Sequence, residues 1–209
     1  EVVADVANPI DGEADLYSIK WKTGPNAGGD VTVAGGEIKA HLDLRDGNDA
    51  SNIGIPYYVE KLNNLANALA TEINKIHVTG WTHPYSENGV SNASTQGIAF
   101  FQQYPTGTDP EGNAGINAKN FFVSDDVLES VYNIATSTEE ITLGANNELR
   151  GNQEVMLALS KLLTNTNLPN ATTTNVSGFQ SYYRSLVVEI GVGAQTARRW
   201  RPSSCGSSK

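Results

Sequence analysis

The sequence from residue 55 to residue 80 is IPYYVEKLNNLANALATEINKIHVTG. Its apolar residues recur at spacings of three and four, which is the period of one face of an α-helix. This stripe comprises Val59, Leu62, Leu65, Ala66, Leu69, Ile73 and Ile76. Pro56 is tolerated in a first helical turn, and Gly80 is typical of the residue that caps a helix end. The pattern predicts an amphipathic helix over residues 56–78.

Two shorter stretches downstream have the same period. In the first, Ser124 can cap a helix with acidic residues in its first turn, and the apolar side comprises Val127, Leu128, Val131 and Ile134. In the second, Asn152 precedes the apolar residues Val155, Met156, Leu159, Leu162 and Leu163. We therefore expect one helix that reaches about residue 134 and another that follows residue 152.

The last apolar stripe follows Ser177. Its residues recur at helical spacing and are Phe179, Tyr183, Leu186, Val187 and Ile190. Gly191 and Gly193 interrupt it, and glycine costs about 1 kcal/mol in a helix interior. Their presence predicts a bend or a close contact at this point. Because Ala194, Ala197 and Trp200 continue the stripe, we expect a long helix over residues 178–200 that is truncated at its end.

The remaining segments have turn and strand patterns. Residues 16–21 alternate as a half-buried strand does, a turn is expected at 24–29, and residues 37–45 are also strand-like. Residues 81–120 are rich in Gly, Asn, Ser, Thr and Pro, which indicates an irregular excursion with a hairpin. We predict an α+β fold: a β-rich segment at 1–45, then a mainly helical core domain at 46–200. Two long and two shorter helices would form a bundle, with a small β-rich or irregular outer part.

The composition excludes several classes of protein. The 209 residues are 39% hydrophobic and carry a net charge of −9 without a basic cluster, which argues against nucleic-acid binding. No apolar run approaches the roughly 18 residues of a membrane helix, and the single Cys205 excludes an internal disulfide. Residues 201–209 are expected to be a linker or a non-native tail. The start at Glu1 indicates a fragment of a longer protein.

Few residues are suited to catalysis. The histidines are His41, His77 and His83, and none lies in a catalytic or metal-binding motif; His77 is expected to be a packed or capping residue. An EF-hand calcium loop that began at Asp46 would need Gly and Glu where the chain has Ser51 and Tyr57, so we expect an acidic turn there. The acidic pairs are Asp43/Asp46, Asp125/Asp126 and Glu139/Glu140. We predict no catalytic, cofactor-binding or metal-binding residue, no cofactor and no enzyme activity.

The long helices supply the candidate core and assembly residues. These are Leu62, Leu65, Leu69, Ile73, Leu186, Val187 and Ile190. Each stabilises the fold by roughly 1.5–3 kcal/mol when it is fully buried. For the last helix two interpretations stay open: its stripe packs within one core, or part of it packs on a neighbouring subunit or on missing parts of the chain.

Several stretches together are similar to the hook-associated protein 1 family, which forms the hook–filament junction of the bacterial flagellum. They include Gly35-Gly36-Glu37 through Asp46, the helix that ends Ile73-Asn74-x-x-His77-x-x-Gly80, and the aromatic pair Phe100-Phe101. The others are Phe122-Val123-Ser124 through Ser137, and Tyr183-x-Ser185-Leu186-Val187-x-Glu189-Ile190-Gly191. The resemblance covers roughly residues 35–200, with gaps at 81–99 and 138–176. Residues 201–209 and Trp81-Thr82-His83-Pro84 depart from the family pattern.

The resemblance implies an extracellular structural subunit, exported unfolded and without a cleaved signal peptide. Its partners would be the hook protein, the second junction protein and copies of itself, without nucleic acid or membrane insertion. Because the family's terminal coiled-coil segments are absent, we expect this fragment to be monomeric in dilute solution.

Two rival interpretations stay open. One is a surface carbohydrate-binding or adhesive module that uses aromatics of residues 81–104, namely Trp81, Tyr85, Phe100 and Tyr104. The other is a carboxylate-based hydrolase, which would need Asp43 and Asp46 opposite another acid across a cleft.

Overall fold

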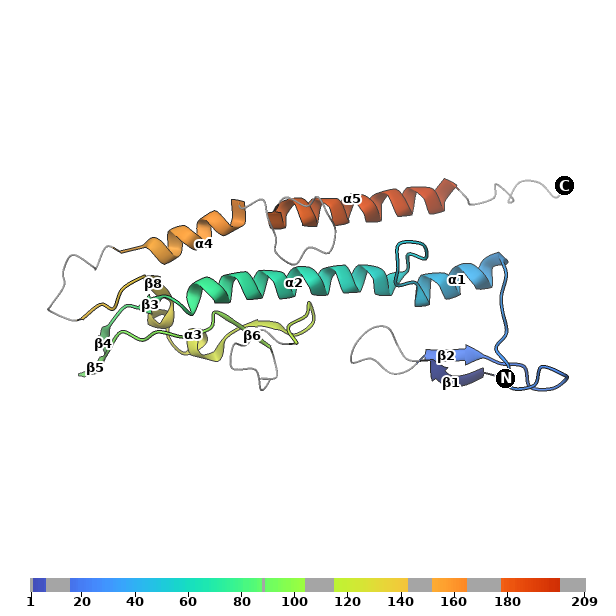
Figure 1. Ribbon diagram of the computed structural model, residues 1–209, viewed down its shortest axis with the longest axis horizontal. Coiled ribbons are helices and arrows are strands. Elements are labelled where there is room, and N and C mark those ends of the chain that lie inside the picture. Colours follow the sequence, from blue (N-terminus) through green and yellow to red (C-terminus); the bar gives the residue numbers. More distant parts are fainter. Residues whose placement is uncertain are drawn as a thin grey trace, which may run out of the picture. The chain divides into compact units, whose positions relative to one another are not determined.

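The computed structural model describes residues 2–6, 16–87, 89–103, 115–142, 152–164 and 178–199 (Figure 1). These residues form five α-helices and four two-stranded antiparallel sheets, so the protein has the predicted α+β class. The chain divides into two compact units, Glu1–Leu62 and Asn63–Lys209. The predicted tail, residues 201–209, lies outside the described residues. No helix in the described ranges is both long and apolar enough to span a membrane.

The first unit begins with a small sheet. Strands β1 (Val2–Val6) and β2 (Leu16–Ile19) pair antiparallel, with a register shift between Ala4 and Val6. A turn follows, in which the Trp21 N–H donates to the Gly29 carbonyl over 2.9 Å. The strand and the turn lie where the sequence pattern predicts them.

Helix α1 (Gly36–Asp46) occupies the segment predicted to be strand-like, so that prediction was wrong. No residue of α1 is buried, so the alternation of its apolar residues does not reflect one covered face. Local preferences favour the helix instead: Glu37 lies in its first turn, Arg45 lies in its last, and Lys39 pairs with Asp43 four residues later. The β-rich character predicted for residues 1–45 therefore does not extend through residues 36–45.

The turn between α1 and helix α2 (Ile55–His77) depends on two glycines. The Gly54 N–H donates to the Gly47 carbonyl over 3.1 Å. A Cβ on Gly47 would lie 2.5 Å from the Asn52 carbonyl oxygen, and one on Gly54 would lie 2.6 Å from that of Asp43. Only glycine permits so close an approach of the two backbone segments.

In the second unit, α2 contributes to a hydrophobic cluster with α4 (Glu154–Thr164) and α5 (Gly178–Arg199). Ala68, Leu162 and Phe179 form the cluster, one residue from each helix. The partly buried residues that pack against it are Leu65, Leu69, Ile73 and Ile76. The Glu154 N–H donates to the Asn152 side-chain oxygen over 3.1 Å, but the first helical bond of α4 runs from the Leu157 N–H to the Gln153 carbonyl. Gln153 therefore holds the cap position, and Asn152 lies one residue before the position that the sequence predicted for it. Within the second unit, Figure 1 draws α4 and α5 on one side of the 63–77 part of α2, and α3 with β6 on the other.

The excursion at 81–120 is more regular than predicted, because its described part contains short paired strands. The hairpin strands are β4 (Tyr85–Glu87) with β5 (Val90–Asn92), while β6 (Phe101–Gln103) pairs with β7 (Phe121–Val123). Strand β3 (Trp81–Thr82) pairs with β8 (Ala135–Ser137). Asparagines of α2 hold the next segment: Asn63 accepts from the Ala118 N–H, and Asn67 donates to the Ile116 carbonyl.

Helix α3 (Asp125–Glu129) is shorter than the predicted helix. Ser124 caps it as predicted and accepts a hydrogen bond from the Val127 N–H. Ser130 then accepts from the Tyr132 N–H and starts a separate 3-10 turn, η1 (Val131–Asn133). Serine side chains that bond to nearby backbone groups compete with helix continuation, which explains the break at this position.

Candidate assembly surface

Helix α5 carries two lines of apolar side chains with opposite environments. Phe179 and Leu186, seven residues apart, are buried. Tyr183, Val187 and Ile190 are 56%, 50% and 45% exposed. Their spacings of four and three match the repeat by which two helices pack along a shared seam. We call Tyr183, Val187 and Ile190 the α5 outer stripe.

The glycine in the middle of this helix lies in open space. A Cβ at Gly191 would meet no atom within 4 Å, and Gly191 has no positive φ. The predicted close contact at Gly191 is therefore wrong for the chain on its own. The reason is that the adjoining surface of α5 is uncovered, since Val188 is also 63% exposed.

The seven predicted core and assembly residues divide into two groups. Leu65, Leu69 and Ile73 pack against the shared cluster, and Leu186 is buried. In contrast, Leu62 is 39% exposed, and Val187 and Ile190 belong to the α5 outer stripe. These three side chains are therefore not part of the core of the described chain, and for Val187 and Ile190 packing on another chain stays the open interpretation. Helical spacing identifies an apolar face, but it does not say which segment covers that face.

A second face of α2 carries a polar hub. Ala70, Asn74 and His77 are each at most 1% exposed and are spaced four and three apart along α2. The Asn74 side-chain oxygen accepts from the N–H groups of Phe100 and Phe101, and its amide donates to the Phe101 carbonyl over 2.7 Å. The Asn74 side chain thus forms hydrogen bonds with three backbone groups of the segment at Phe100 and Phe101. We call Asn74 and His77 the α2 hub.

His77 connects the hub to two other segments. Its Nδ1 lies 2.7 Å from the Ile98 carbonyl oxygen, and its Nε2 lies 2.9 Å from the Ala135 nitrogen. The ring packs edge-on against Phe100, with centroids 5.3 Å apart. Burial lowers the pKa of His77, and the hydrogen bond to Ile98 partly opposes that effect. The expectation of a packed histidine is confirmed.

Gly80 completes this region by close packing. A Cβ at Gly80 would lie 2.9 Å from both Ala135 Cβ and Val155 Cγ2. Its φ is not in the left-handed range, so the predicted role as a helix cap is not what requires glycine here.

The sequence did not reveal that Asn74 is buried. The available signal was the line of small and polar residues Ala70, Asn74 and His77 beside the apolar stripe.

Four of the ionisable residues considered for catalysis make local structural contacts. His41 lies on the exposed surface of α1, 3.8 Å from Glu37, and the His83 Nδ1 lies 2.8 Å from the Pro84 carbonyl oxygen. Asp43 pairs with Lys39, and Asp46 pairs with Arg45. Across the residues that the structure describes, no three or more His, Cys, Asp or Glu side chains gather to hold a metal ion.

The acidic turn that starts at Asp46 is held by its own backbone. One carboxylate oxygen of Asp49 accepts from the Ser51 hydroxyl over 2.6 Å, and from the N–H groups of Ser51 and Asn52 over 2.8 Å each. The hydrogen bond from the Ser51 side chain is the largest of the effects that lower the pKa of Asp49. This carboxylate is therefore engaged in an Asx turn, as the expectation of an acidic turn requires.

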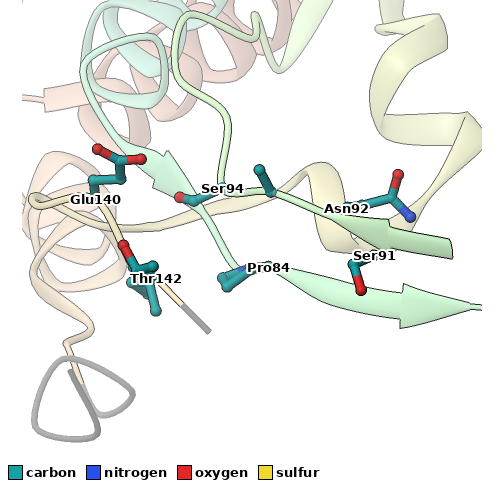
Figure 2. A pocket seen from close by; sticks show the side chains of 8 residues that line it. Pro84, Ser91, Asn92, Ser94, Glu140 and Thr142 are labelled. Atoms are coloured by element: carbon teal, nitrogen blue, oxygen red, sulfur yellow. The ribbon is translucent and has the colours of Figure 1, made fainter. Parts of the chain in front are cut away.

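A small pocket of about 210 Å³ lies in the second unit, beside the β4–β5 hairpin (Figure 2). Its lining residues are Pro84, Ser91, Asn92, Ala93, Ser94, Glu140, Ile141 and Thr142. Figure 2 shows Glu140 and Thr142 on one side, and Ser91 and Asn92 on the other. The Ser94 hydroxyl donates to the Thr82 carbonyl and so is engaged within the fold.

Trp81, Tyr85 and Phe100, three of the aromatics proposed for carbohydrate binding, are not among the residues that line this pocket. Trp81 is half-buried in β3, Tyr85 stacks on Tyr132 with centroids 4.3 Å apart, and Phe100 packs on His77. Tyr104 lies outside the described residues. The described aromatics of this group are thus occupied by packing or pairing and do not form a shared platform at the pocket.

The chain matches no protein-family model, and no curated protein or solved structure is significantly similar to it. The resemblance to the flagellar family therefore rests on the sequence motifs alone. One of those motifs has a defined structural role. Asn74, His77 and Gly80 are all buried where α2 meets the segment at 98–101 and the start of β8.

Proposed function

We propose that the protein is a structural subunit of the bacterial flagellum that joins the hook to the filament by self-assembly. The observation that carries the proposal is the α5 outer stripe, which is exposed beside the buried Phe179 and Leu186 of the same helix. An exposed apolar stripe of this kind supports packing against another helix. The sequence motifs over residues 35–200 supply the flagellar assignment.

The outer stripe is suited to contact with another helix. Tyr183, Val187 and Ile190 follow one another at spacings of four and three, so a second helix laid along α5 would cover all three. Full burial of an apolar side chain contributes roughly 1.5–3 kcal/mol. Three half-exposed side chains therefore leave several kcal/mol of favourable burial for assembly.

We further propose that the helices of the second unit belong to a bundle of two long and two shorter members. The cluster of Ala68, Leu162 and Phe179 supports this for α2, α4 and α5. Helix α3 would be the fourth member, through its buried Val127. In this bundle α2 and α5 are the long helices, and the short sheets form the outer part.

The proposal includes the cellular setting that the sequence resemblance implies. The subunit would act outside the cell, after export without a cleaved signal peptide. Its partners would be the hook protein, the second junction protein and other copies of itself. Its role is mechanical, so no cofactor, nucleic acid, membrane insertion or catalysed reaction is part of the proposal.

A genetic experiment tests the assignment. The gene that encodes the chain is deleted in its source bacterium, and flagellin is measured in the medium and on the cells. We expect non-motile cells that retain hooks and release flagellin into the medium, with filaments restored by the intact gene. Normal filaments on the deletion strain would contradict the flagellar assignment.

A further inference from the structure

His77 is held in one protonation state by its two partners. The Ile98 carbonyl can only accept a hydrogen bond, so Nδ1 must carry the ring proton. The Ala135 N–H can only donate, so Nε2 must be an unprotonated acceptor. The buried ring is therefore the neutral imidazole, in a single tautomer.

We propose that His77 is an acid-sensitive latch, whose protonation releases the start of β8 from α2. The second proton would bind Nε2, the atom that accepts from Ala135. The new Nε2–H would then point at the Ala135 N–H, donor against donor, and the hydrogen bond would be lost. The ring would also become a cation in a fully buried site.

In the part of the chain that the structure describes, no charged side chain is placed to offset such a cation. The described segment 98–103 and strands β3 and β8 contain no ionisable side chain. On the helices and turns packed nearby, the charged residues that are exposed are Lys75, Asp125, Asp126, Glu129, Glu139, Glu140, Glu154 and Lys161. Glu72 is half-buried but lies about 140° around α2 from His77, and His83 is engaged with Pro84.

The expected opening is local. The latch holds Ala135 directly, whereas the bonds from His77 Nδ1 to Ile98 and from Asn74 to Phe100 and Phe101 do not depend on an unprotonated Nε2. The helix cluster of Ala68, Leu162 and Phe179 contains no titratable group. Acid should therefore loosen the start of β8, while α2, α4 and α5 stay together.

The pH range follows from the sign of the shift. A released ring has the ordinary histidine pKa of about 6.5, whereas burial lowers the pKa of the latched ring. The latch is thus at full strength above about pH 6.5 and weakens as the pH falls below that value. The open fraction should rise roughly tenfold per pH unit until the pKa of the latched ring is reached.

Amide hydrogen exchange of the full 209-residue chain tests the latch. Rates are measured from about pH 7.5 to about pH 5, and each is divided by the rate of an unstructured peptide at the same pH. Below pH 6.5 we expect the corrected opening at Ala135 to increase about tenfold per unit. Amides in the α2 part of the helix cluster should not change. Corrected protection at Ala135 that stays constant over the range would overturn the proposal.

Three variants assign the effect to one ring. His41→Gln and His83→Gln should retain the pH dependence at Ala135, whereas His77→Gln should abolish it. If His77→Gln does not fold, nitrogen NMR of the wild-type imidazoles replaces it. We then expect Nε2 of His77 to gain its proton in step with the opening at Ala135. A protonated His77 beside a protected Ala135 would contradict the latch. A folded His77→Gln variant whose opening at Ala135 still increases about tenfold per pH unit would also contradict it.

Discussion

Helices α2 and α5 have nearly the same length, 23 and 22 residues, and similar apolar stripes, yet they are covered differently. In its second-unit part, α2 uses one face for the helix cluster and another, with Asn74 and His77, for the strand side. Helix α5 buries Phe179 and Leu186 but leaves Tyr183, Val187 and Ile190 exposed. The comparison shows that helical periodicity identifies a face and that the surrounding chain determines whether the face is used for folding or for assembly.

The largest difference should follow from placing a charge on each helix. Leu69→Asp puts a carboxylate against the Ala68 cluster, and the cost should be comparable with the whole stability of a small domain. Val188→Asp makes the same kind of change at an exposed position of α5. We expect circular dichroism to show a loss of folding for the first variant only. Similar melting of both variants would remove the distinction between the two helices.

Two neighbouring residues of α5 give the next largest contrast. Leu186→Ala should lower the free energy of unfolding by about 2–5 kcal/mol, because it leaves a cavity at a buried site. Val187→Ala should change it by less than about 0.5 kcal/mol, since that side chain is half exposed. Urea unfolding measures both values. Equal losses would mean that the α5 outer stripe is already covered within the chain.

The polar face of α2 should contribute somewhat less. Asn74→Ala removes the acceptor of the Phe100 and Phe101 N–H groups, and each unsatisfied buried group costs about 1–3 kcal/mol. Asn64→Ala, at an exposed position of the same helix, is the matched control and should be nearly neutral. The comparison is made by urea unfolding of the two variants. A neutral Asn74→Ala would show that the clamp does not stabilise the strand side.

The smallest predicted effects have opposite signs. Gly80→Ala should destabilise the protein by about 1–3 kcal/mol, because its Cβ would meet Ala135 and Val155 at 2.9 Å. Gly191→Ala should stabilise it by about 0.5–1 kcal/mol, because the site is open and alanine is the better helix former. Thermal unfolding distinguishes the signs. A destabilising Gly191→Ala would indicate that this surface of α5 is covered.

Much of the helical structure could be predicted from sequence. The stripe at 56–78 corresponds to α2 at Ile55–His77, and Ser124 caps α3 as expected. These features depend on local chemistry: the apolar period, and side-chain oxygens that accept from the first N–H groups of a helix. Such signals lie within one segment and need no knowledge of its neighbours.

The rest depends on contacts that one segment does not contain. The alternation at 37–45 indicated a strand, but no residue of α1 is buried, so local helix preferences decide the outcome. The strands paired in β3–β8 are separated by more than fifty residues, and the burial of Asn74 requires the 98–101 segment to lie against α2. The exposure of Val187 and Ile190 likewise depends on which chain lies beside α5.

The central claim is that the α5 outer stripe serves assembly and not folding. The most direct test expresses the full-length protein with Val187→Asp and Ile190→Asp in cells that lack the gene. Ser185→Asp with Gln195→Asp, at exposed positions of α5 outside the stripe, is the control. The account predicts normal levels of the stripe variant, flagellin in the medium and no filaments, with filaments present in the control. Wild-type filaments on cells that carry the stripe variant would contradict it.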